Sequence, residues 1–185
     1  DVDGDGNMEI IFGSCDMKLY CLTSNGFFKW QFWTGDSIWS SAMVADVDGD
    51  GRNEVMFGSL DGYVYCLNWA GSMKWKYAAG GRVVCVPACA DIDGDNRTEI
   101  LVGSRGVGLL CLNGTGYLKW QSKTTGGLYF SSPVVGDIDA DSRLEILFGS
   151  SQAVYCLNQT GGNKWVYYTS GNVTSTPVVA DLDGD

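Results

Sequence analysis

DVDGDGRNEVMFGS, at residues 46–59, decides the fold because the chain repeats this stretch. Close copies begin at residues 1, 91 and 137, and a shortened copy, DLDGD, occupies residues 181–185. The copies begin about 45 residues apart, and self-similarity at a fixed period of this length identifies a repeat protein. We therefore treat residues 1–185 as a single repeat domain. Its units cover about 1–45, 46–90, 91–136 and 137–180, and residues 181–185 begin a fifth.

Each unit is expected to form four short β-strands. The dipeptide Asp61-Gly62 lies between two β-rich runs, which is a hairpin signal. No segment shows a sustained period of 3.6 residues, so no helix is expected. Four strands in about 45 residues are the content of one β-propeller blade, so the sequence predicts an all-β propeller of four such blades. In the second unit the strands are predicted at about 40–45, 54–59, 63–68 and 72–77.

The two ends of the chain leave the blade count open. The first unit lacks its own first strand, and a spare strand is predicted at 175–180, which would complete the first blade and close a ring of four. Both 1–5 and 181–185 would then supply the same half of one loop. This redundancy favours a segment of a larger propeller or array, or end-to-end joining of chains. A closed ring of four and part of a larger propeller both stay open.

Composition limits the function classes. Hydrophobic residues make up 45% of the chain and aromatic residues 12%, which excludes disorder. The net charge is −10, yet the acidic residues outside the repeated loops are only Asp16, Asp36 and Asp61. The 12 basic residues are scattered, which argues against nucleic acid as a partner. No apolar run is long enough to span a membrane. The chain has no histidine, so the commonest general base and zinc ligand are missing.

The acidic loop has the pattern D-x-D-x-D-G-x-x-E, which supplies hard oxygen ligands at alternate positions of a tight turn. Ca²⁺ takes about six to eight such ligands, whereas Mg²⁺ prefers water and strict octahedral geometry. Two carboxylates about 4 Å apart repel each other by roughly 4 kcal/mol at an effective dielectric constant of about 20. No nearby Lys or Arg at a ligand position is expected to offset this repulsion. The sequence therefore predicts about four Ca²⁺ ions, one per loop, and an ordinary Asp/Gly turn is the alternative.

The predicted ligands are the side chains at the first, third, fifth and ninth loop positions and the carbonyl at the seventh. They are Asp1, Asp3, Asp5, Asn7 and Glu9; Asp46, Asp48, Asp50, Arg52 and Glu54; Asp91, Asp93, Asp95, Arg97 and Glu99; and Asp137, Asp139, Asp141, Arg143 and Glu145, with Asp181, Asp183 and Asp185 in the partial fifth loop. Asn96 and Ser142 replace the glycine at the sixth position. Serine tolerates a left-handed backbone less well than asparagine, so the fourth loop is expected to bind most weakly.

Two family resemblances cover essentially the whole chain. SSPVVGDIDADSRLEILFGS, at 131–150, resembles an FG-GAP/VCBS repeat, the calcium-loop propeller blade of integrin α-chain heads and many bacterial surface proteins. AVYCLNQTGGNKW, at 153–165, is similar to the blade segment of PQQ-like quinoprotein propellers. The first resemblance implies that each acidic loop joins the first two strands of a blade. The second implies that four repeated tryptophans dock between blades: Trp30, Trp75, Trp120 and Trp165.

Other residues carry weaker signals. Four cysteines recur at one strand position and are expected to be small buried hydrophobes without disulfides: Cys21, Cys66, Cys111 and Cys156. The non-repeated Trp33, Trp39 and Trp69 are candidates for a surface site. Weak glycosylation sites, each in an N-x-T sequence, are Asn113, Asn158 and Asn172.

These observations predict a non-enzymatic, calcium-binding propeller module that is extracellular, at the cell surface or periplasmic. Its role would be structural, adhesive or self-assembling, and its partners other proteins or copies of itself. A lectin-like propeller that binds glycans is the alternative. The non-repeated tryptophans and Asp36 would then be the candidate glycan-binding residues. A fragment of a PQQ-dependent dehydrogenase is a third possibility, but no non-repeated acidic cluster is evident that could form its pocket. No catalytic residue is predicted.

Overall fold

The computed structural model describes residues 1–122 and 131–182, which form fifteen β-strands; no helix is assigned within these ranges. The strands make four antiparallel sheets, named blades 1 to 4 in chain order. Blade 1 contains β1 (Glu9–Gly13), β2 (Lys18–Thr23) and β3 (Phe28–Trp33). Blade 2 contains β4 (Met43–Ala45), β5 (Glu54–Gly58), β6 (Tyr63–Leu67) and β7 (Met73–Ala78). Blade 3 contains β8 (Ala88–Ala90), β9 (Glu99–Ser104), β10 (Gly108–Asn113) and β11 (Leu118–Ser122). Blade 4 contains β12 (Val134–Gly136), β13 (Glu145–Ser150), β14 (Ala153–Leu157) and β15 (Asn163–Tyr168).

Each blade is a meander in which consecutive strands pair as antiparallel hairpins. In blade 2, Val55 lies opposite Leu67, and Tyr63 lies opposite Ala78. A register shift follows the repeated cysteine in the pairing of the last two strands of every blade. The strands of the second unit lie close to their predicted ranges. The prediction of an all-β fold built from short-stranded blades is therefore confirmed.

The turns form where the sequence places glycine and asparagine. Gly62 has a φ of 88°, which only glycine adopts without strain, and it closes the hairpin between β5 and β6. In the next turn the Asn68 side-chain oxygen accepts hydrogen bonds from the backbone N–H groups of Ala70 (3.1 Å) and Ser72 (2.8 Å). This Asx-type arrangement fixes the β6–β7 hairpin. The blade therefore follows from local turn chemistry as well as from apolar strands such as β5, which is buried along its whole length.

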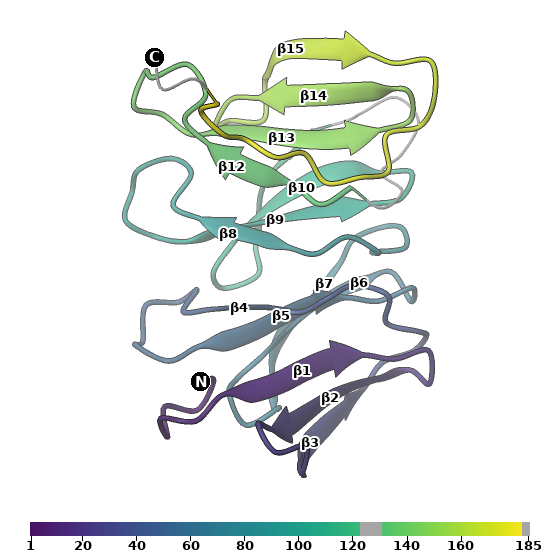
Figure 1. Cartoon of the computed structure of the whole chain (residues 1–185), viewed down its shortest axis with the longest axis vertical. Coiled ribbons are helices and arrows are strands. Elements are labelled where there is room, and N and C mark those ends of the chain that lie inside the picture. The colour runs from purple at the N-terminus through teal and green to yellow at the C-terminus, as the bar shows by residue number, and fades with distance from the viewer. Residues whose placement is uncertain (123–130, 183–185) are drawn as a thin grey trace.

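The blades are stacked in chain order, with blade 1 at one end of the stack and blade 4 at the other (Figure 1). Within the described residues, hydrophobic core clusters join blades 1 and 2, 2 and 3, and 3 and 4, but not 4 and 1, so the blades form an open arrangement. The strand predicted at 175–180 is wrong, because no strand is assigned there. Residues 175–180 are linked to the segment just before β12 of blade 4 by a 3.2 Å hydrogen bond from the Ser132 N–H to the Thr176 hydroxyl. Without a sheet of its own among the described residues, the segment has no ladder to join.

The hydrophobic core lies between adjacent blades. Phe57 and Leu67 of blade 2 pack with Leu19 of blade 1, and the other face of blade 2 packs Met56 against Ile100 of blade 3. The repeated cysteines are fully buried and, like the other three cysteines, are free thiols. Burial raises the pKa of the Cys111 thiol to about 12, so this thiol is chemically quiet. The prediction that these cysteines serve as core residues is confirmed.

Tryptophans join successive blades. The indole N–H groups of Trp30, Trp75 and Trp120 donate to backbone carbonyls of the following blade, at 3.1, 3.0 and 3.0 Å. In each case the acceptor lies in the turn between the last two strands of that blade. Each ring covers a turn glycine so closely that an added Cβ would lie within 2.7 Å of it; these glycines are Gly71, Gly116 and Gly161. Three of the four repeated tryptophans therefore dock between blades as expected. The fourth, Trp165, is 43% exposed.

No helix within the described ranges is both long and apolar enough to cross a lipid bilayer.

Candidate metal centre

The four acidic loops lead into the second strand position of each blade: β1, β5, β9 and β13. In blades 2, 3 and 4 they connect the first strand to the second, and Figure 1 shows these connections along one side of the stack. This is the position that the FG-GAP resemblance implies. The sequence repeat thus becomes a row of similar loops on one edge of the molecule.

Each loop brings carboxylates together. Three carboxylate groups per loop have an oxygen within 4.8 Å of the oxygens of the other two. The groups are Asp1, Asp3 and Asp5; Asp46, Asp48 and Asp50; Asp91, Asp93 and Glu99; and Asp137, Asp139 and Glu145. An all-oxygen, anionic donor set of this kind fits Ca²⁺. The first and third positions thus meet in every loop, joined by the fifth in the first two loops and by the ninth in the last two. The full set of four side chains and one carbonyl in a single loop stays a prediction.

The first aspartate shapes the loop. In the second loop, Asp46 accepts hydrogen bonds from the N–H groups of Gly49 (2.7 Å) and Gly51 (2.9 Å). Asp50 accepts from the N–H of Arg52 at 2.9 Å. The first and third loops form the same contacts from Asp1 and Asp91. These bonds curl the backbone around the carboxylates, so the loop is organised by its own side chains.

The loops need left-handed backbone at two positions. The sixth residue has a positive φ in every loop, including Asn96 (61°) and Ser142 (65°). The fourth residue also does so: it is glycine in three loops but Ala140, with a φ of 57°, in the last. The glycine pattern of the sequence indicates the left-handed backbone at the sixth position but was not expected to require it at the fourth. The last loop thus carries two residues with a Cβ where glycine is preferred. That this loop binds calcium most weakly stays a prediction.

We expect Ala140→Gly to raise the free energy of unfolding by about 1 kcal/mol, because glycine adopts this φ without steric cost. Urea denaturation of the variant and the parent protein measures the change. Gly49→Ala is the matched reverse control: an added Cβ at Gly49 meets nothing within 4 Å. It should therefore lose a similar amount through backbone conformation alone. Equal stability of all three proteins would contradict the interpretation.

A lysine from the last strand of each blade reaches into the acidic loop. Its ammonium group contacts both the second aspartate and the glutamate of that loop. Lys29 Nζ lies 2.5 Å from Asp3 and 2.9 Å from Glu9, and Lys119 Nζ lies 2.6 Å from Asp93 and 2.8 Å from Glu99. Lys74 contacts Asp48 and Glu54, and Lys164 contacts Asp139 and Glu145, in the same way. The expectation that no nearby basic residue offsets the carboxylate repulsion is therefore wrong.

The signal for these lysines was in the sequence. The repeated K-W phrase places each lysine immediately before the docking tryptophan, and the separation from the loop glutamate is 20 residues in three units and 19 in the fourth. The repeated phrase was assigned a role only for its tryptophan, so the ion pair of its lysine with the acidic loop was not predicted. A basic residue that recurs in step with an acidic loop predicts an ion pair between the two.

The glutamate side chains are the buried part of the site. Glu9, Glu54, Glu99 and Glu145 have side-chain exposures of only 1–2%. One carboxylate oxygen accepts the lysine, and the other accepts the N–H of the loop's second residue. In the second and third loops this bond joins Val47 to Glu54 at 3.2 Å and Ile92 to Glu99 at 3.0 Å. Each glutamate thus links the loop, its own strand and the last strand of the blade.

Electrostatics favour the charged forms of these pairs. The hydrogen bond from Lys29 lowers the pKa of the Asp3 carboxyl, and the hydrogen bonds to Asp3 and Glu9 raise the pKa of Lys29. Burial alone would lower the pKa of Lys119, but its hydrogen bonds to Asp93 and Glu99 outweigh this effect, and the pKa is raised. The contacts with the acidic loop therefore hold these lysines in their charged form.

The remaining predicted residues contribute less. Asp181 is exposed and belongs to none of the acidic groups found, and Asp183 and Asp185 lie outside the described residues. The side chains of Asn113 and Asn158 accept hydrogen bonds within their own turns, whereas Asn172 is exposed. Glycosylation at these positions stays a prediction.

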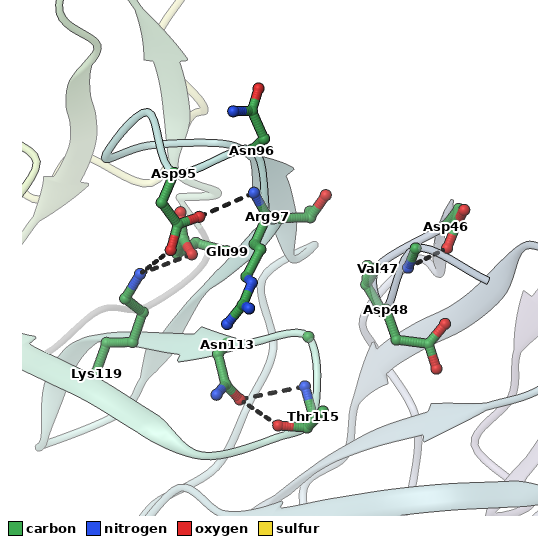
Figure 2. Close-up of a pocket in the computed structure, with 13 residues that line it drawn as sticks. Asp46, Val47, Asp48, Asp95, Asn96, Arg97, Glu99, Asn113, Thr115 and Lys119 are labelled. Atoms are coloured by element: carbon green, nitrogen blue, oxygen red, sulfur yellow. Dashed lines mark hydrogen bonds and ion pairs between the residues drawn. The ribbon is translucent and has the colours of Figure 1, made fainter. Parts of the chain in front are cut away.

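A cleft between blades 2 and 3 opens beside the loops. It has a volume of about 480 Å³ and is lined by Asp46–Gly49 of one loop, Asp95–Glu99 of the next, the turn at Asn113–Thr115, and Lys119. Figure 2 shows Asp48 on one side and Arg97 with Asn113 on the other. A smaller cleft of about 260 Å³ lies at the matching place between blades 3 and 4. Neither is lined by the non-repeated tryptophans, of which Trp33 and Trp39 are more than half exposed.

Short-stranded blades, interblade tryptophans and acidic loops between the first two strands together define a β-propeller with a repeated acidic loop. A family model described as FG-GAP-like repeat matches residues 1–57 and 91–148. The chain belongs to the FG-GAP-like repeat family. A second model, the lambda-carrageenase β-propeller domain, matches residues 38–88. The resemblance to quinoprotein blades is matched by neither model and stays a prediction.

Solved structures support the fold. The biofilm matrix protein Bap1 of Vibrio cholerae has a TM-score of 0.74 at 21% identity, over 91% of this chain and 27% of that one. BamB of Moraxella catarrhalis has a TM-score of 0.71 at 18% identity, over 98% and 52%. Sqt1 of Saccharomyces cerevisiae has a TM-score of 0.75 at 14% identity, over 92% and 50%. The chain thus spans about a quarter to a half of these structures. No curated protein sequence matches it.

Proposed function

We propose that this chain is a calcium-binding, non-enzymatic propeller module with a structural role outside the cytoplasm. The observation that carries the proposal is the fourfold row of acidic loops, each with three carboxylates within 4.8 Å of one another. One Ca²⁺ per loop would be held by the aspartates at the first, third and fifth positions and the carbonyl at the seventh. The glutamate at the ninth position would complete the set or support it from behind. Residues 1–185 would act as one domain.

Calcium would neutralise the charge of the loop and would have no catalytic role. Each loop carries four carboxylates and one paired lysine, so a divalent cation removes most of the remaining local repulsion. The loop connects the first two strands of a blade, and binding would therefore make that connection rigid. Extracellular calcium is concentrated enough to fill sites of modest affinity, which agrees with a location outside the cytoplasm. The description of the Vibrio neighbour as a biofilm matrix protein supports the same location.

The acidic residues outside the loops support a non-enzymatic role. The Asp61 carboxylate accepts hydrogen bonds from the Gly35 N–H (2.8 Å) and the Tyr65 hydroxyl (2.7 Å). Asp16 accepts from the Tyr20 hydroxyl. Asp36 accepts from the N–H of Ser37. The turns that carry these aspartates are hydrogen-bonded to one another, but within the described residues their carboxylates do not form one of the acidic groups. A quinone-dependent dehydrogenase would need such a shared acidic pocket.

The ends of the stack support docking to other blades. Trp165 is the exposed member of the docking tryptophans, and the turn at Gly26 has nothing within 4 Å of a would-be Cβ. These are the two halves of a contact that forms at all three interior junctions. We propose that blades of the same type, in the same polypeptide or in another copy, dock at these ends.

A calcium titration of thermal unfolding tests the function. Raising Ca²⁺ from chelator conditions to about 10 mM should raise the Tm by on the order of 10 °C, because ligands that bind only the folded state stabilise it by mass action. Light scattering in the same samples follows self-association. Asp46→Asn should reduce the shift by removing one site, and an equal concentration of Mg²⁺ should have a smaller effect. The same Tm in chelator and in calcium would contradict the proposal.

The cleft between blades 2 and 3 favours a second function, the binding of a glycan. Its walls present the polar side chains of Asp48, Arg97 and Asn113, which suit hydroxyl groups. Binding to a glycan array that is lost in Arg97→Ala would support this function. A blank array would exclude it for the glycans tested.

A further inference from the structure

The lysine in each acidic loop occupies a place where a cation is expected. In blade 2, Lys74 comes from β7 and bonds to Asp48, and its Nζ also lies 3.0 Å from Glu54 and 3.7 Å from Asp50. Asp48 and Asp50 are two of the predicted calcium ligands. The lysine therefore neutralises carboxylates on which calcium binding also depends.

The buried glutamate cannot lose its contact with the lysine without a large loss of folding stability. Glu54 has a side-chain exposure of 1%, and its two oxygens accept one hydrogen bond from Lys74 and one from the Val47 N–H. A buried carboxylate without its counter-ion is strongly destabilising. The lysine thus stays close to the loop in the folded protein, whatever else binds there.

The loop backbone is likewise held without help from a metal. Asp46 receives the N–H groups of Gly49 and Gly51, and Asp50 receives that of Arg52. Together with the lysine, these bonds satisfy part of the negative charge from within the chain. The other three loops repeat the lysine contacts on both the second aspartate and the glutamate.

From this geometry we infer that the repeated lysine is a built-in counter-ion that competes with calcium for the second aspartate and so keeps the calcium affinity of each loop low. The inference rests on the proposed calcium function and concerns its regulation. The four carboxylates of a loop carry a formal charge of −4, and the lysine reduces it to −3. The lysine therefore allows the blade to fold in the absence of calcium. When calcium binds, it must share or displace the contact between the lysine and the second aspartate. Loops of this kind respond to high, extracellular concentrations of calcium.

The test is Lys74→Met, which keeps most of the side-chain volume and removes the charge. Lys76→Met is the matched control: Lys76 lies on the same strand, but its Nζ sits 4.5 Å above the Tyr63 ring. In a calorimetric calcium titration of the whole chain, Lys74→Met should convert one site per chain to an affinity at least about tenfold higher. Its Tm in chelator should fall, and its calcium-induced rise in Tm should grow. Lys76→Met should titrate like the parent protein.

The outcomes separate the two proposals. An unchanged or weaker calcium affinity in Lys74→Met, with calcium binding intact in the parent protein, would overturn the counter-ion role and leave the calcium function standing. No binding of calcium by the parent protein would overturn both. If Lys74→Met is unfolded in chelator, Lys74→Gln takes its place, because its amide can still donate to Glu54. The same tightening of one site is expected, and its absence overturns the inference.

Discussion

Replacing Glu54 by alanine is expected to lower the free energy of unfolding by about 3 kcal/mol, even in chelator. Its side chain is 1% exposed and accepts both Lys74 and the Val47 N–H. Removing it leaves a partly buried ammonium and a buried backbone N–H without their shared acceptor, and an unsatisfied buried donor is costly. Urea denaturation measures the loss.

Glu54→Gln separates the two contributions. Its amide oxygen can still accept the Val47 N–H, whereas its charge is gone, so it should lose clearly less than Glu54→Ala. Equal and small losses in both variants would show that the glutamate does not hold the blade together. The glutamates would then be free for another role, such as direct metal binding.

Replacing Trp75 by alanine is expected to cost about 3 kcal/mol, since a large aromatic side chain leaves an interblade junction. Trp75 packs against the cluster between blades 2 and 3, donates to the Gly114 carbonyl at 3.0 Å and covers Gly116. The variant removes the packing and the hydrogen bond together. The loss is again measured by urea denaturation.

Two further variants test this junction. Trp165→Ala changes the fourth copy, which is 43% exposed, and should cost less than about 1 kcal/mol. Gly116→Ala should be destabilising, because its Cβ would lie 2.6 Å from the Trp75 ring at a φ of 83°. A harmless Trp75→Ala, or losses equal to those of Trp165→Ala, would contradict a docking role.

The blade was predictable because each of its signals is local. Asp61-Gly62 and Asn68 fix turns through residues that are adjacent in the chain, and the β-rich runs between the turns set the strands. The grouping of the first and third aspartates was predictable for the same reason, since one short loop brings them together in every blade. The left-handed backbone at the fourth residue of the acidic loop was not predicted. In the last loop this residue is Ala140, and an alanine gives no sequence signal for a positive φ.

Three features were not predictable from local pattern alone. The contact between Lys74 and Glu54 joins residues on the second and last strands of a blade, so its only sequence signal is the recurrence of the lysine in step with the acidic loop. The predicted strand at 175–180 has a strand-like sequence, but a strand is defined by its pairing partner. The open arrangement of blades follows from contacts between sheets, which the repeat period does not specify.

The most direct test of the account is the number of calcium ions bound. The chain is freed of metal with chelator, dialysed against about 10 mM Ca²⁺, and its bound calcium is measured against the dialysis buffer. About four ions per chain are expected, one for each acidic loop, with the loop at Asp137–Glu145 filling last. Asp46→Asn should bind about one ion fewer. If the chain binds no more calcium than its charge attracts nonspecifically, and Asp46→Asn makes no difference, the loops are turns held by lysine rather than metal centres.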